Sequence, residues 1–100
     1  MSYDPGALAA ALAAAVGDDS ALIADLRVAF IESAVRHLDL LGRARCDANW
    51  ELAAWRIKGL AASFGVTHLM ALADEAAQAA PGDPVILRRL RTALSRLEQA

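Results

Sequence analysis

Residues 50–65, which read WELAAWRIKGLAASFG, decide the fold, because this one segment carries both an apolar helical stripe and a tryptophan on the opposite side. Apolar residues recur there at three- and four-residue steps, which is the spacing of one side of a helix. At about 100° per residue, Trp55 lies about 180° from Phe64 and points away from this apolar side. The sequence therefore predicts a helix with Trp55 on its outer face and with an apolar stripe formed by Ala53, Ile57, Leu60, Ala61 and Phe64.

The outer face of this predicted helix combines an indole, a cation and a glycine. An indole in water is costly and is typical of the anchors of protein interfaces. Glycine inside a helix costs about 1 kcal/mol relative to alanine, so Gly59 indicates that another backbone or side chain lies close against this turn. We predict that Glu51, Trp55, Lys58, Gly59 and Ala62, together called the Trp55 face, bind a partner. Alternatively, Trp55 covers the alkyl stems of its neighbours and serves stability alone.

Helix start and stop signals divide the rest of the chain into four further helices. Asp-Pro pairs at 4–5 and 83–84 can each cap and start a helix, and glycines at 17 and 65 suit left-handed helix ends. The first predicted helix is about Pro5–Val16, and the second has an acidic start at 18–20 and runs to about Ala44. The third is capped by Asn49 and closed by Gly65. The fourth is capped by Thr67, and the last is about Pro84–Glu98.

Apolar spacing also predicts which side chains of these helices face the core. The expected inward positions are Leu22, Leu26, Phe30, Ala34, His37 and Leu41 in the second helix, Leu69, Leu72, Ala73, Ala76 and Ala80 in the fourth, and Leu87, Leu90, Leu94 and Leu97 in the last. Trp50 is expected to pack against the core. Asp74 and Glu75 are expected to be solvated. Arg88, Arg89, Arg91 and Arg96 form either a solvated face or a rim for an acidic partner.

Length and composition favour one all-α domain. The chain has 100 residues, of which alanine fills 25 and aromatic residues 5 %, and this composition favours helices over sheets. Five helices with short connections predict an antiparallel four-helix bundle with the short N-terminal helix as a cover, all within a single domain at 1–100.

Several classes of function are disfavoured by charge and residue content. A net charge of −2 gives no general attraction to nucleic acid or to anionic lipid. The lone Cys46 excludes an intrachain disulfide, and the two distant histidines give little support for a metal site. The apolar stretch 7–16 is too short to span a bilayer and follows no basic region, so we expect a cytoplasmic protein that binds no membrane. With no nucleophile–base pair or phosphate-binding loop, we expect neither an enzyme nor a cofactor.

Residues 54–65, AWRIKGLAASFG, resemble the core motif of histidine phosphotransfer (HPt) domains. In that family an alanine precedes the phosphoaccepting histidine, and a lysine, a glycine, small residues and a closing glycine follow. The resemblance extends over about 22–75, including the tripeptides FIE at 30–32 and NWE at 49–51. It implies an HPt-like bundle, whose relatives pass phosphate between receiver domains of response regulators. It also implies that Lys58 lies near the phosphoryl oxygens and that Gly59 lets the receiver approach.

This sequence departs from the HPt motif at the histidine itself, because Trp55 stands there. Phosphotransfer needs the lone pair of an imidazole nitrogen, whereas the indole nitrogen carries only a donor N–H. We therefore expect a module that docks a receiver or histidine kinase domain without accepting phosphate. One alternative is phosphotransfer through His68, expected to be exposed at the start of the fourth helix, or through His37, expected to be structural. Another is a homodimer formed through the Trp55 face.

Overall fold

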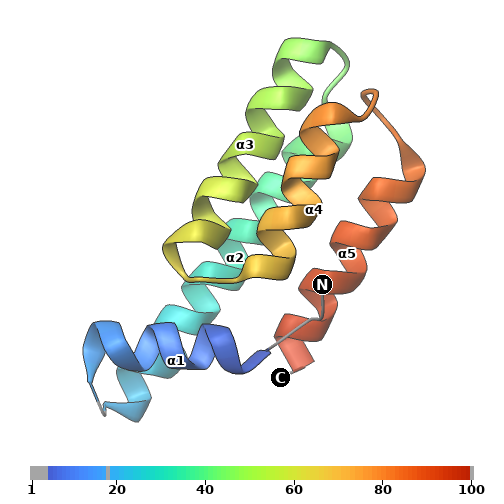
Figure 1. The fold of residues 1–100 in the computed structure, drawn as a ribbon. Helices are drawn as coiled ribbons and strands as arrows, with labels where there is room; N and C mark the ends of the chain where they lie inside the picture. Colours follow the sequence, from blue (N-terminus) through green and yellow to red (C-terminus); the bar gives the residue numbers. More distant parts are fainter. Residues whose placement is uncertain (1–4, 18, 100) are drawn as a thin grey trace.

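The computed structural model describes residues 5–17 and 19–99, and every regular element in those ranges is an α-helix. The helices are α1 (Pro5–Val16), α2 (Ser20–Arg43), α3 (Asp47–Ser63), α4 (Thr67–Gln78) and α5 (Pro84–Gln99). Figure 1 shows α2, α3, α4 and α5 side by side, with α1 running across the first part of α2. The predicted all-α class is confirmed for these residues.

Aspartate side chains cap two of the helices, as the sequence predicted. Asp19 Oδ1 accepts a hydrogen bond of 3.0 Å from the backbone N–H of Leu22 at the start of α2. Asp83 Oδ1 accepts from the N–H groups of Val85, at 2.9 Å, and Ile86, at 3.3 Å, at the start of α5. Each carboxylate satisfies N–H groups that the first turn of a helix leaves without a helical partner. The predicted contributions of Asp4 and Asp18 lie outside the described residues.

Left-handed glycines end α1 and α3. Gly17 has φ 73° and Gly65 has φ 66°, a region that side chains with a Cβ disfavour. After α3, the N–H of Gly65 donates to the carbonyl of Ala62 at 3.2 Å, and the N–H of Val66 donates to that of Ala61 at 3.0 Å. This pair of bonds is a Schellman motif, so the predicted closure at Gly65 is confirmed.

The predicted caps of α3 and α4 are wrong. Helix α3 begins at Asp47 rather than after Asn49, and the N–H of Trp50 already donates to the carbonyl of Cys46 at 3.0 Å. An acidic first turn suits the positive end of a helix, which favours this earlier start. Thr67 is the first residue of α4, and Val66 is its cap. Because Val66 also closes the Schellman motif, the turn leaves no separate residue to cap α4 through its side chain.

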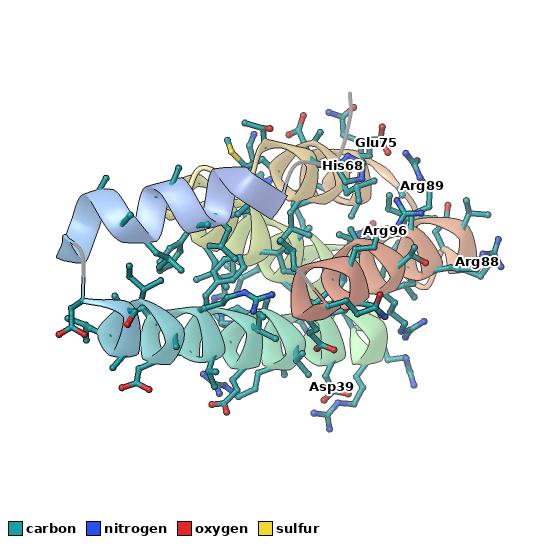
Figure 2. All side chains as sticks on the ribbon, turned by 90° about the horizontal axis from the view of Figure 1, so that it is seen from below. Asp39, His68, Glu75, Arg88, Arg89 and Arg96 are labelled. Atoms are coloured by element: carbon teal, nitrogen blue, oxygen red, sulfur yellow. The ribbon has the colours of Figure 1, made fainter. Side chains whose placement is uncertain are left out.

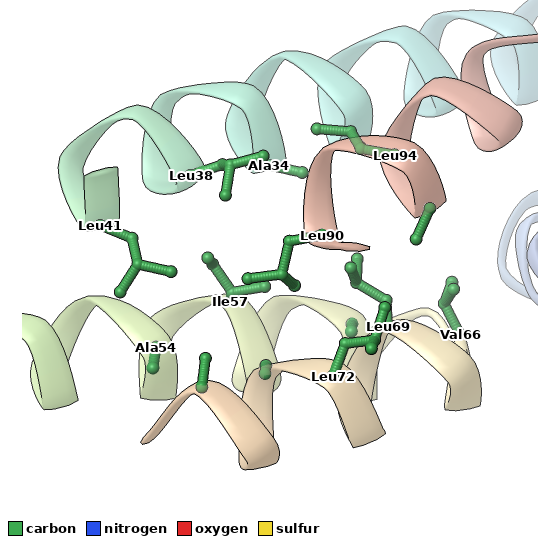
Figure 3. Close-up of a cluster of buried hydrophobic side chains, with 14 of the residues drawn as sticks. Ala34, Leu38, Leu41, Ala54, Ile57, Val66, Leu69, Leu72, Leu90 and Leu94 are labelled. Atoms are coloured by element: carbon green, nitrogen blue, oxygen red, sulfur yellow. The ribbon is translucent and has the colours of Figure 1, made fainter. Parts of the chain in front are cut away.

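The core lies where α2, α3, α4 and α5 meet (Figure 3), and α1 adds the buried side chains of Leu8 and Leu12 to it. Its largest side chain is Trp50, which is 1 % exposed and donates from Nε1 to the carbonyl oxygen of Ala76 at 2.6 Å. Phe30 and Phe64 pack edge to face with ring centroids 4.9 Å apart. Most predicted core positions are buried: Phe30, Ala34, Leu41, Ala53, Ile57, Ala61, Leu69, Leu72, Ala73, Ala76, Leu87, Leu90, Leu94 and Leu97.

A few predicted core positions lie further out. Leu22 is 41 % exposed and belongs to the first turn of α2. Ala80 is exposed because α4 has already ended at Gln78. Four other side chains are half-buried at the edge of the core: Leu26, His37, Leu60 and Phe64. None of the described helices has the length and apolar character that crossing a bilayer requires.

The buried indole of Trp50 predicts a large effect of Trp50→Phe on stability. The variant loses a buried hydrogen bond and leaves a void, so we expect the free energy of unfolding to fall by about 1–3 kcal/mol. Urea unfolding measures this change, and Trp55→Phe is the matched control, with an expected change below about 0.5 kcal/mol. Equal effects of the two substitutions would contradict the described positions of the two indoles.

Candidate functional site

Trp55 lies on the outer side of α3, and 54 % of its surface is exposed. The number of residues per helical turn explains why Trp55 points outward. Trp50 is buried against α4, and a residue five positions later lies about 140° further around the helix. The predicted outward orientation of Trp55 is therefore confirmed. No other aromatic side chain among the described residues is exposed to this extent.

The five residues of the Trp55 face fall within about 100° of one another around α3. Within this face Trp55, Gly59 and Ala62 are exposed, while Glu51 and Lys58 are half-buried. The structure thus places an indole, two small residues and two charged side chains on one surface. Its composition matches what the sequence predicted, and its role as a binding surface stays a prediction.

Lys58 joins the Trp55 face to α4 through an ion pair. Its Nζ lies 3.0 Å from Oδ1 of Asp74, and about half of each side chain is exposed, 43 % for Lys58 and 51 % for Asp74. An ion pair this exposed stabilises a fold by no more than about 1 kcal/mol. Asp74 and Glu75 are exposed, as the sequence predicted, and Glu75 is also paired, because its Oε2 lies 2.7 Å from Arg89 Nη1 on α5. Consecutive carboxylates of α4 therefore pair with helices on its two sides.

Gly59 has no packing partner among the described residues. A Cβ atom at this position would have no atom of the described chain within 4 Å, apart from the backbone of its own helix. The Ser63 hydroxyl donates to the Gly59 carbonyl at 3.0 Å, a bond that any residue at position 59 could accept. No backbone or side chain of the described residues packs against this turn, so the close approach of a partner at Gly59 stays a prediction. The cost of glycine in the helix is not offset by packing inside this part of the chain.

The two histidines lie in different surroundings. His37 Nδ1 is 2.6 Å from the carbonyl oxygen of Ser33, one turn earlier in α2, and the half-buried ring fits the expected structural role. His68, expected to be exposed, is half-buried and lines a hollow between α4 and α5 together with arginines. Within residues 5–17 and 19–99, no three His, Cys, Asp or Glu side chains form a group that could hold a metal ion.

One apolar feature near the Trp55 face was not anticipated from the sequence. Leu40 on α2 and Leu52 on α3 are each 47 % exposed, and both line a hollow of about 390 Å³ between the two helices. Arg43 and Arg56 lie at the same hollow. Leu52 precedes Trp55 by three residues, so the exposed apolar surface continues from Trp55 towards α2. Only the packing of α2 on α3 brings these side chains together, and no local pattern marks them.

Comparison of the chain with models of protein families, with curated proteins and with solved structures found no match.

The open surroundings of Gly59 predict that Gly59→Ala stabilises the chain. Alanine fits a helix interior without a clash here, and we expect the free energy of unfolding to rise by about 1 kcal/mol. Urea unfolding tests this, with Gly65→Ala as a control that should lower stability because of its positive φ. A loss of stability in Gly59→Ala would show that the fold itself requires this glycine.

Proposed function

We propose that this chain is an HPt-like docking module that binds a receiver domain or a histidine kinase domain and accepts no phosphate at position 55. In this proposal α2–α5 form an antiparallel four-helix bundle with α1 as a cover. The exposed indole of Trp55, at the position of the HPt histidine, is the observation that carries the proposal. The contacts of α3 with α2 and α4, and of α5 with α2 and α4, support the bundle.

The chemistry of the Trp55 face favours docking over phosphotransfer. The indole nitrogen has no lone pair in the ring plane with which to attack a phosphoryl group. A large ring held on a rigid helix is, in contrast, the kind of side chain that supplies most of the energy of an interface. Gly59 and Ala62 present little side chain beside it, so a partner backbone can come close to α3. Leu52 extends the apolar area.

Binding of the purified receiver and histidine kinase domains encoded in the same genome tests this proposal. Trp55→Ala should weaken binding at least about tenfold, because an anchor residue contributes more than about 1.4 kcal/mol. Val85→Ala is the matched control, since Val85 is 53 % exposed on α5 and belongs to neither the face nor the adjoining hollow. Both variants should keep the stability of the parent within about 1 kcal/mol.

Two outcomes would contradict docking. In the first, no receiver or kinase domain binds, or Val85→Ala weakens binding as much as Trp55→Ala. In the second, the mass measured by light scattering rises with protein concentration and Trp55→Ala abolishes the rise. That second outcome would assign the Trp55 face to a homodimer instead.

A second candidate function is phosphotransfer through His68. It is favoured by the arginines that line the hollow beside this histidine, because guanidinium groups stabilise phosphoryl oxygens. In this case a phosphorylated receiver should transfer an acid-labile label to the chain, and His68→Gln should abolish the transfer. Absence of label in the parent protein would remove this candidate and leave docking.

Trp55→His should create a phosphoacceptor if the rest of the Trp55 face keeps the geometry of the family it resembles. The new imidazole would replace an exposed ring and have Lys58 three positions away. The expected result is acid-labile labelling by a phosphorylated receiver at position 55, absent from the parent and from Trp55→Phe. A folded Trp55→His variant that binds the receiver and takes no label would show that the face no longer aligns a histidine for transfer.

A further inference from the structure

Three arginines of α5 line one hollow on the side of α4 that faces away from α3. The hollow has a volume of about 280 Å³, and Arg88, Arg89 and Arg96 line it together with Thr92 and with His68 of α4. At about 100° per residue the four α5 positions fall within about 100° of one another, so they share one face. Figure 2 shows His68 on α4 beside Arg89 and Arg96 on α5.

Among the described residues, the arginines of this hollow are only partly paired with carboxylates. Arg89 Nη1 pairs with Glu75 Oε2 at 2.7 Å. Among the ion pairs of the described residues, none engages Arg88 or Arg96. The chain as a whole carries a net charge of −2, so the cluster is a local reversal of the overall sign. Like charges gathered on one helix face repel, and an anion between them removes that repulsion.

The lining also contains an apolar part. Leu72 of α4 and Ala93 of α5 are both buried core residues, and both border the hollow. Because Leu72 and Ala93 are each only 2 % exposed, a ligand in the hollow would meet guanidinium groups, a threonine hydroxyl and the alkyl stems of the arginines. Guanidinium groups donate paired hydrogen bonds that match the oxygens of a phosphate, and the alkyl stems suit an organic group attached to it.

We infer that this hollow binds the phosphate group of a phosphate monoester, with Arg88, Arg89 and Arg96 as its ligands and Thr92 as a further donor. This site is separate from the Trp55 face and stands whether or not that face docks a partner. Its small volume and the acidic balance of the chain disfavour a nucleic acid strand as the ligand. Binding is reversible and involves no bond to His68.

NMR titration of the parent protein with phenyl phosphate and with inorganic phosphate tests the site. The backbone amide signals of His68, Thr92 and Arg96 should shift and saturate with a dissociation constant of about 1 mM, which is weak because the arginines are exposed. Phenyl phosphate should bind more tightly than inorganic phosphate because its ring can pack on the arginine alkyl stems, and phenol should cause no shift. Signals of the Trp55 face should stay in place.

Matched arginine variants separate a defined site from diffuse charge. Arg96→Gln should weaken binding of phenyl phosphate about tenfold. Arg91→Gln removes the same charge from the same helix and should change binding less than about twofold, because Arg91 lines a different hollow beside α2. Equal losses in the two variants, or shifts that do not saturate, would overturn the inference.

A phosphoserine peptide distinguishes the two sources of a phosphate monoester. Tighter binding of this peptide than of phenyl phosphate would support the site and identify a phosphorylated protein as its ligand. Equal or weaker binding would support the site with a small ester as ligand. Neither result depends on a receiver or kinase domain, so failure here is distinguishable from failure of the docking proposal.

Discussion

The hydrogen bond from Trp50 Nε1 to the carbonyl oxygen of Ala76, at 2.6 Å, fixes how α3 is rotated against α4. Burial of this indole in the first turn of α3 leaves the residue five positions later about 140° away, which places Trp55 in solvent. The buried alanines on both helices agree with this rotation, because they let the two backbones approach closely: Ala53, Ala54 and Ala61 on α3, and Ala73 and Ala76 on α4. Turning α3 outward by half a turn would place bulky and charged side chains against α4 at the cost of this packing.

Helix α4 separates two surfaces of different chemistry. Asp74 pairs with Lys58 on α3, and Glu75 pairs with Arg89 on α5, so adjacent carboxylates mark the two edges of α4. The α3 side carries the exposed indole that we propose as the anchor for a partner protein. The α5 side carries arginines around a hollow, where an anion can be held. Since these exposed ion pairs contribute little stability, a ligand at either edge could displace them at small cost.

The sequence predicted the features that depend on local chemistry. Asp19, Asp83 and the left-handed glycines mark their helix ends correctly, because a cap requires only neighbouring residues. The same local reasoning misplaced the start of α3, whose acidic first turn begins at Asp47, and the cap of α4, which belongs to the turn that also ends α3. The outward position of Trp55 followed from helical period alone. Helical period could not predict the hollow between α4 and α5. There His68 meets Arg88, Arg89 and Arg96, which lie far away in the sequence, only because α4 packs on α5.

The most direct test of the account follows the two indole N–H signals by NMR while a receiver or kinase domain that binds this chain is added. Trp50 and Trp55 differ in burial, and each gives one signal that reports on its own surroundings. If Trp55 anchors the partner, its indole signal moves and becomes protected from exchange with water, while the Trp50 signal keeps its position. A bound complex in which the Trp55 signal stays unchanged would contradict the account, because the partner would then dock elsewhere on the chain.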